Sequence, residues 1–145
     1  MLYNEVSQEI FTASADYVLV HCISADFSMS AGVAKAFIET GIKDELLSRY
    51  PANKWEGHGY CLPVKINGRI ILNLVTKPKA FFKPTYETLE ESLNDMKKQL
   101  PKHIKLAMPH IGCGFDGLNW TKVSHMIKDT FEDTDIEILV YQYNS

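Results

Sequence analysis

Short apolar runs bounded by turn residues recur along the chain, and such runs are typical of strands buried in a sheet. They predict strands over 2–6, 18–23, 60–65, 69–75, 104–108 and 136–141. Two of these strands flank Asn67-Gly68, the dipeptide favoured in type I′ turns. We therefore expect strands 60–65 and 69–75 to form a hairpin.

Between the strands, apolar residues recur at the three- and four-residue spacing of a helix that buries one face. We expect helices over 33–39 and 42–50, the second of them stopped by Pro51. A longer helix is expected after Pro84, with an apolar stripe formed by Tyr86, Leu89, Leu93, Met96 and Leu100. The last helix is expected over 120–131, with a stripe formed by Trp120, Val123, Ile127 and Phe131.

Strands that alternate with helices, together with one hairpin, predict an α/β fold. The expected architecture is a three-layer α/β/α sandwich around a central mixed β-sheet. No internal repeat, low-complexity tract or linker-like stretch interrupts the pattern, so we expect a single domain over 1–145. Ligands of open α/β sheets bind where strand ends meet helix starts. Two loops meet this condition, one after Ile23 and one after Met108.

Composition narrows the classes of partner. The 145 residues are 46% hydrophobic and 23% charged, as in soluble globular proteins. A net charge of −3 argues against indiscriminate nucleic-acid binding. Because Arg49 and Arg69 are the only arginines, we expect backbone amides rather than an arginine clamp to hold any phosphate. The chain shows no signal-peptide pattern and no apolar stretch of membrane-spanning length. Three cysteines without a CxxC pair predict free thiols and a cytoplasmic location.

The loop over 109–117 is rich in glycine and lies between a predicted strand and a predicted helix. Such a loop presents backbone N–H groups to an anionic ligand, usually a phosphate. Asp116 would repel phosphate if it pointed inward, so it needs another role. It is either a carboxylate beside the ligand or the cap of the helix that starts at Trp120. The loop that ends at 34 is made of small residues from Ser28 onward, which allows a second close approach of backbone to ligand.

Lys77 directly follows the apolar strand 69–75. It is either a solvated lysine at a strand end or an amine at the mouth of a site. A lysine is nucleophilic only when deprotonated, and a nearby carboxylate such as Asp116 either favours the charged form or accepts the proton. No zinc-ligand spacing links His21 and His110, so no metal site is expected, and no GxSxG motif indicates a serine hydrolase.

Taken in order, these segments resemble the macrodomain family, and within it the terminal ADP-ribose protein glycohydrolase subgroup. That subgroup is related to antitoxin macrodomains that remove ADP-ribose from DNA. The resemblance runs through nearly the whole chain, and its segments are 21–24, 29–34, 74–77, 83–87, 108–116 and 133–141. It departs from the usual pattern at Glu9, where many members have aspartate, and at Ser30, where close relatives have glycine.

The resemblance implies ADP-ribose as the ligand, with no cofactor and no metal. It also implies a set of ligand-binding residues taken from matching motif positions. These are Glu9, Ile10, Ser24, Ser30, Ala31, Gly32, Val33, Ala34, Thr76, Pro109, His110, Ile111, Gly112, Cys113, Gly114, Phe115 and Tyr143. The implied catalytic pair is Lys77 and Asp116, with Lys77 attacking C1″ of the distal ribose and Asp116 handling protons.

The implied activity is removal of mono-ADP-ribose from glutamate or aspartate side chains of proteins, with O-acetyl-ADP-ribose as a further substrate. Three alternatives remain open at this point: a non-catalytic ADP-ribose reader, an ADP-ribose-1″-phosphate phosphatase, and a glycohydrolase acting on ADP-ribosylated DNA. The expected partners are ADP-ribose and ADP-ribosylated proteins, with ADP-ribosylated nucleic acid as an alternative. We expect a monomer with no membrane association.

Overall fold

The computed structural model describes residues 1–29 and 32–142. Six strands form one sheet in the order β1-β6-β5-β2-β4-β3. Their bounds are Leu2–Val6, Val18–Ser24, Tyr60–Ile66, Arg69–Lys77, Lys105–Met108 and Glu137–Tyr141 for β1 to β6. All neighbours pair in parallel except β3, which is antiparallel to β4. The mixed sheet that the alternation predicts is therefore confirmed.

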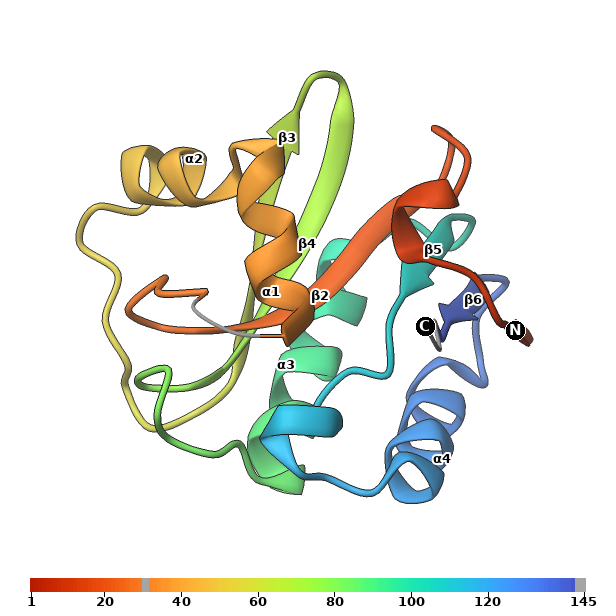
Figure 1. The fold of residues 1–145 in the computed structure, drawn as a ribbon. Coiled ribbons are helices and arrows are strands. Elements are labelled where there is room, and N and C mark those ends of the chain that lie inside the picture. The colour runs from red at the N-terminus through yellow and green to blue at the C-terminus, as the bar shows by residue number, and fades with distance from the viewer. Residues whose placement is uncertain (30–31, 143–145) are drawn as a thin grey trace.

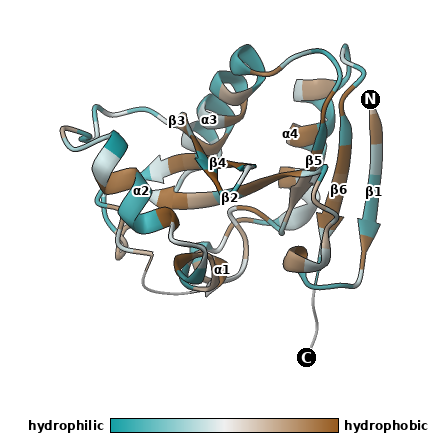
Figure 2. Cartoon of the chain, turned by 90° about the horizontal axis from the view of Figure 1, so that it is seen from above, coloured by the Kyte–Doolittle hydropathy of each residue, from teal (hydrophilic) through white to brown (hydrophobic). Residues whose placement is uncertain are grey.

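Four α-helices of the described residues cover the two faces of this sheet (Figure 1). Their bounds are Gly32–Phe37, Ile42–Arg49, Tyr86–Gln99 and Trp120–Phe131 for α1 to α4. Viewed from above, α1 and α2 lie on one side of the sheet and α3 and α4 on the other, which gives the three expected layers (Figure 2). No helix of the described residues is both long and apolar enough to cross a membrane.

Each face of the sheet has its own apolar core, because successive strand residues point to opposite sides. On β2, Val18 and Val20 join the core beneath α3 and α4, whereas Leu19 and Ile23 join the core beneath α1 and α2. The helical stripes supply the other half of the first core. Fully buried members of these stripes are Leu89, Leu93, Met96, Val123, Ile127 and Phe131.

The structure refines the predicted boundaries at a few points. The predicted helix 33–39 is α1 up to Phe37, followed by a 3-10 turn over Ile38–Thr40 that Gly41 ends with a φ of 88°. Asn67 and Gly68 adopt φ values of 50° and 83°, as a type I′ hairpin turn requires. Two short 3-10 helices, η1 (Ile10–Thr12) and η3 (Gly114–Asp116), carry no helical periodicity and were not predicted.

Gly59 allows β3 to approach helix α3 closely. A Cβ at this position would lie 2.0 Å from the carbonyl oxygen of Thr88, which a backbone atom of a packed helix cannot accommodate. We expect Gly59→Ala to lower the free energy of unfolding by about 3 kcal/mol. The control Gly57→Ala has open space around its Cβ and should cost about 1 kcal/mol for its left-handed φ. Equal losses in urea unfolding would contradict this assignment.

Candidate active site

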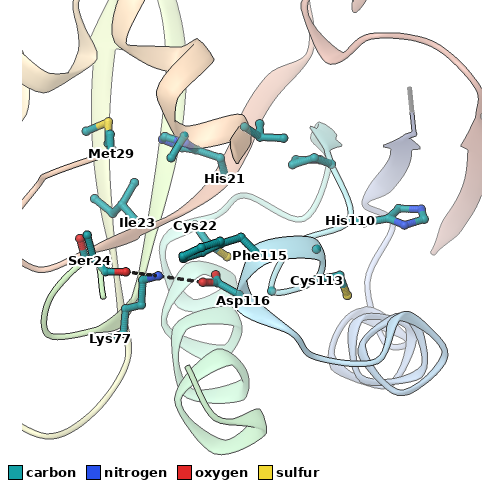
Figure 3. Close-up of a pocket in the computed structure, with 16 residues that line it drawn as sticks. His21, Cys22, Ile23, Ser24, Met29, Lys77, His110, Cys113, Phe115 and Asp116 are labelled. Carbon is teal, nitrogen blue, oxygen red and sulfur yellow. Dashed lines mark hydrogen bonds and ion pairs between the residues drawn. The ribbon is translucent and has the colours of Figure 1, made fainter. Parts of the chain in front are cut away.

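A cavity opens at the carboxyl ends of β2, β4 and β5, where the connecting loops lie side by side (Figure 3). Residues 21–24 of β2, Lys77 at the end of β4 and the glycine loop after β5 form most of its wall. The pairing of β2 with β4 shifts register between Ile23 and Ser24, so that Ser24 lies opposite Lys77 and Thr76 is an extra residue. Such irregularities redirect side chains near functional sites.

Lys77 and Asp116 form a short ion pair in this cavity. The Nζ of Lys77 lies 2.7 Å from Oδ1 of Asp116, and it also donates a hydrogen bond of 3.1 Å to the carbonyl oxygen of Ala80. The two side chains are only 9% and 16% exposed, so solvent screens their attraction much less than at the surface. Figure 3 shows both groups pointing into the same space. An amine and a carboxylate are thus held within proton-transfer distance.

Asp116 is not the cap of the following helix, the alternative that its position before Trp120 allowed. The cap of α4 is Asn119, whose side chain accepts a hydrogen bond from the backbone N–H of Lys122 at 3.2 Å. Asp116 instead ends η3, and Gly117 turns the chain away with a φ of 82°. Its carboxylate is therefore available to Lys77.

Lys83 ties η3 to the loop between β4 and α3. Its Nζ donates a hydrogen bond to the carbonyl oxygen of Phe115 and lies 3.8 Å from the centre of the Phe115 ring. Because Asp116 follows Phe115 directly, these contacts help to hold the carboxylate over the end of β4. The Nζ of Lys77 lies 5.7 Å from the centre of the same ring. Phe115 is thus placed between two ammonium groups.

Ile111 anchors the glycine loop after β5, because its side chain is 2% exposed and packs in the core beneath α3 and α4. Gly112 and Gly114 adopt φ values of 73° and 68°, a backbone region that favours glycine. A Cβ on Gly112 would meet side-chain atoms of Leu118 and Leu89 at 3.0 and 3.1 Å, so the loop is also tightly packed there. The two glycines therefore set the path of the loop backbone, and the side chains of Phe115 and Asp116 line the cavity beside it.

The loop after β2 forms the opposite wall and is internally braced. The hydroxyl of Ser24 donates to Oδ1 of Asp26 at 2.5 Å, and the N–H of Ser28 donates to the same oxygen at 3.1 Å. Phe27 and Met29 are each 3% exposed and adopt positive φ values of 57° and 48°, which are unfavourable for side chains of their size. Burial of both residues holds the loop in this conformation.

Comparisons with known proteins identify the family of the chain. The chain is 43% identical to the ADP-ribose glycohydrolase OARD1 of Homo sapiens over 139 residues, covering 94% of this chain and 88% of the human protein. The chain belongs to the ADP-ribose glycohydrolase OARD1 family. No protein-family model matches the chain.

Solved structures similar to this OARD1-family chain establish the macrodomain fold. The macrodomain of Thermus aquaticus DarG superposes with a TM-score of 0.75 at 22% identity, covering 97% of this chain and 98% of that one. The structure of Thermosipho africanus DarTG in complex with ADP-ribose gives a TM-score of 0.70 at 18% identity, covering 97% of this chain and 41% of the other. The macrodomain architecture expected from the sequence is confirmed.

Most of the residues that the macrodomain resemblance implies lie in the wall of the cavity. They are Ser24, Val33, Ala34, Lys77, Pro109, His110, Gly112, Cys113, Gly114, Phe115 and Asp116. Two others are buried behind this wall, Thr76 at 1% and Ile111 at 2% exposure. Glu9 is exposed and Ile10 is buried in the core, and neither lines the cavity. Gly32 begins α1, while Ser30, Ala31 and Tyr143 fall outside the described residues.

Five further residues line the cavity but were not expected from the sequence: His21, Cys22, Ile23, Met29 and Ala80. The first three belong to the strand that carries Ser24, so the end of that strand as a whole was the available signal. The ring of His110 is stacked on Trp120, with ring centres 4.0 Å apart, and points away from Lys77 and Asp116 (Figure 3). Within residues 1–29 and 32–142, no cluster of three potential ligands could hold a metal ion.

The cysteines of this macrodomain are poor nucleophiles. Burial raises the pKa of the Cys22 thiol well above its ordinary value, and the charge of Asp116 adds to the effect. Burial and the same carboxylate raise the pKa of Cys113 to about 11. Both thiols are therefore protonated at neutral pH, which makes them weak nucleophiles.

His21 is a neutral histidine buried beside the cavity. Asn73 donates through Nδ2 to the carbonyl oxygens of Leu62 and Ile71, so its Oδ1 accepts a hydrogen bond from Nε2–H of His21 at 2.6 Å. The other ring nitrogen, Nδ1, is buried and has no partner among the described residues. Protonation would place an unpaired charge there, and burial accordingly lowers the pKa of His21 from 6.5 to about 4.

The lowered pKa of His21 predicts a loss of stability in acid. In the unfolded chain His21 is protonated below about pH 6.5, whereas in the folded chain it is protonated only below about pH 4. The free energy of unfolding should therefore fall with decreasing pH in this interval, by about 1.4 kcal/mol per pH unit from this residue. His21→Gln retains an amide donor for Asn73 and should show a shallower slope in urea unfolding between pH 7 and pH 4.5. Equal slopes for the wild type and His21→Gln would contradict the assignment of this pH dependence to His21.

Proposed function

We propose that this protein is an ADP-ribosyl hydrolase that binds ADP-ribose and removes mono-ADP-ribose from glutamate and aspartate side chains of proteins. Membership of the ADP-ribose glycohydrolase OARD1 family supports the activity. The solved DarTG complex supports ADP-ribose as the ligand. The observation that carries the proposal is the buried pair of Lys77 Nζ and Asp116 Oδ1, 2.7 Å apart in the cavity.

In the proposed complex, the glycine loop wraps the diphosphate and the proximal ribose. Its backbone supports this role, because Gly112 and Gly114 adopt left-handed conformations that shape the loop and the first N–H groups of η3 have no acceptor within so short a helix. The segment that leads from β2 into α1, together with Val33 and Ala34 of that helix, closes on the ligand from the other side. The distal ribose then extends toward Ser24 and Lys77, with its C1″ carbon next to the amine.

The first chemical step transfers the ADP-ribosyl group to Lys77. Asp116 takes a proton from the ammonium group, and the freed Nζ forms a bond to C1″ while the bond between C1″ and the carboxyl oxygen of the substrate breaks. The electron pair of the broken bond leaves with the carboxyl group, which receives the proton from Asp116. A carboxylate is a good leaving group, so this step needs little acid assistance.

The second step releases ADP-ribose. A water molecule attacks C1″ and gives a proton to Asp116 while Nζ of Lys77 departs as a neutral amine. Asp116 then returns the proton to Lys77, which restores the starting ion pair. The sequence of steps uses side chains and water only, so we propose that no cofactor takes part. An acetyl group on the 1″ oxygen of ADP-ribose offers the same type of leaving group, so this form of O-acetyl-ADP-ribose is a second proposed substrate.

The proposal is tested by measuring ADP-ribose release from a protein mono-ADP-ribosylated on glutamate. O-acetyl-ADP-ribose and a DNA-linked substrate are run in parallel. We expect release from both esters and a slower or absent reaction with DNA. ADP-ribose binding without release from any substrate would indicate a reader module instead. Release of phosphate from ADP-ribose-1″-phosphate at a higher rate would indicate a phosphatase.

A further inference from the structure

A group of exposed aromatic and basic side chains borders the cavity next to the Lys77–Asp116 pair. It consists of Lys79, Phe81, Phe82, Lys83 and Phe115, which we call the aromatic rim. The phenyl groups of Phe81, Phe82 and Phe115 are 72%, 45% and 62% exposed. Elsewhere in the described residues large apolar side chains are mostly buried in the two cores. Clustered exposed apolar residues of this kind mark interaction sites.

The rim is ordered by contacts within the loop between β4 and α3. Phe81 and Phe82 pack edge to face with ring centres 4.9 Å apart, and Lys79 lies 6.0 Å from the centre of the Phe81 ring. The N–H of Phe82 donates to the carbonyl oxygen of Lys79 at 3.0 Å, which closes the turn. Lys83 lies over Phe115 in the same way. The rim therefore combines apolar surface with positive charge.

The rim lies directly beside the reacting groups. Phe81 follows Ala80, whose carbonyl oxygen accepts the hydrogen bond from Lys77, and Phe115 precedes Asp116. Figure 3 shows the Phe115 ring next to the ion pair. The rim belongs to the end of the cavity where Lys77 lies, which in the proposed complex is the end that holds the distal ribose and its attached group. An occupant of the rim is thus the molecule that carries the modification.

Charge decides which class of molecule this is. Neither Lys79 nor Lys83 has a carboxylate partner among the described residues, so both can contact a negative group. Two ammonium groups on a chain with a net charge of −3 suit a short segment with one or two carboxylates. They suit a nucleic-acid strand poorly, because such binding depends on neutralising many phosphates. The phenyl rings add a surface for apolar side chains.

We propose that the aromatic rim binds the polypeptide segment that flanks the modified carboxyl group, and that it favours segments with an additional acidic residue and an apolar residue. This inference rests on the proposed function for the identity of the modified group. Carboxylates of the segment contact Lys79 and Lys83, and its apolar side chain covers Phe81 and Phe82. The cavity recognises the ADP-ribose group, and the aromatic rim adds specificity for the polypeptide to which that group is attached.

Binding is the direct test, and it does not depend on turnover. Three probes share ADP-ribose in a hydrolysis-resistant oxime linkage: an acidic peptide that contains leucine, the same peptide with amides in place of the flanking carboxylates, and a minimal linker without peptide. We expect wild-type protein to bind the acidic peptide about tenfold more tightly than the minimal probe. Phe81→Ala with Phe82→Ala should remove most of this gain, and Lys79→Gln should reduce the preference for carboxylates over amides.

The controls are matched substitutions of exposed residues away from the rim. Ile70→Ala removes an exposed apolar side chain from the β3–β4 hairpin, and Lys102→Gln removes an exposed charge. Both should bind all three probes as the wild type does, and the rim variants should bind the minimal probe normally. Equal affinities of wild type for the three probes would overturn the inference. The inference would also be overturned if the rim variants weakened binding only of an ADP-ribosylated single-stranded oligonucleotide. It would likewise be overturned if the wild type formed a dimer that the rim variants abolished.

Failure of the proposed function looks different from failure of this inference. Tight and rim-dependent binding of the acidic peptide without hydrolysis of its ester counterpart would leave the rim assignment intact and contradict the activity. Hydrolysis of the ester together with equal binding of all probes would contradict the rim assignment alone.

Discussion

Replacement of Lys77 by alanine should reduce ADP-ribose release by about a thousandfold or more, because the variant lacks the proposed nucleophile and cannot form the proposed covalent intermediate. ADP-ribose affinity should change by only about threefold, since the glycine loop and the loop after β2 contribute the remaining contacts of the cavity. Single-turnover release from a glutamate-modified protein measures the rate. Isothermal titration with ADP-ribose measures the affinity.

Lys77→Arg separates a nucleophile from a simple positive charge. Arginine can retain an ion pair with Asp116, but its guanidinium remains protonated and does not attack C1″. We therefore expect it to be as inactive as alanine. Lys102→Ala, in an exposed position away from the cavity, serves as the control and should retain full activity. Substantial activity in Lys77→Arg would contradict nucleophilic catalysis and favour electrostatic stabilisation by the ammonium group.

Replacement of Asp116 by asparagine should slow release by about a hundredfold to a thousandfold, within the range of general acid–base catalysis. Asparagine keeps the size of the side chain and can still accept a hydrogen bond from Lys77, but it cannot carry the proton. Both proposed steps use Asp116. Without the carboxylate, however, Lys77 can still lose its proton to water, whereas the water that attacks in the second step has no base, so the intermediate should accumulate. Mass spectrometry of the protease-digested protein should then find ADP-ribose attached to Lys77.

The surface pair of Lys97 and Asp133 provides a matched control for this experiment. Its atoms lie 2.6 Å apart, close to the 2.7 Å between Lys77 and Asp116, but the Asp133 side chain is 74% exposed. Asp133→Asn should therefore leave activity unchanged and alter stability by no more than about 1 kcal/mol. If Asp116→Asn were slow without any adduct on Lys77, the first step would limit the variant, which would contradict the expected accumulation.

Local sequence patterns predicted most of the secondary structure because strand and helix spacing follow directly from burial of one face. Leu89, Leu93 and Met96 illustrate this, since their helical spacing was sufficient to place them in the core and all are fully buried. The hairpin at Asn67-Gly68 was equally accessible, because left-handed backbone conformations strongly favour these residues. The short helix η3 escaped prediction because one turn contains too few residues to show a period.

The positions of the site residues were less accessible. The sequence allowed Asp116 to be a helix cap, and the choice of Asn119 instead depends on where α4 begins. The sequence also allowed two interpretations of Lys77, a solvated side chain at a strand end or a buried amine in the site. The structure buries it, because the extra residue Thr76 in the pairing of β2 and β4 places Lys77 opposite Ser24. The aromatic residues at 81 and 82 carried no periodic signal that would separate rim from core.

By itself, the sequence determined the order of strands and helices, the glycine-rich loop suited to a phosphate, and the family to which the chain belongs. These features depend on residue spacing and residue type, which a single chain displays directly. Only the tertiary structure decided that Lys77 contacts Asp116. The two are 39 positions apart, and the number of residues between them does not predict their distance in the folded sheet. Their contact arises because β2 pairs in parallel with both β4 and β5, which brings the ends of those strands together.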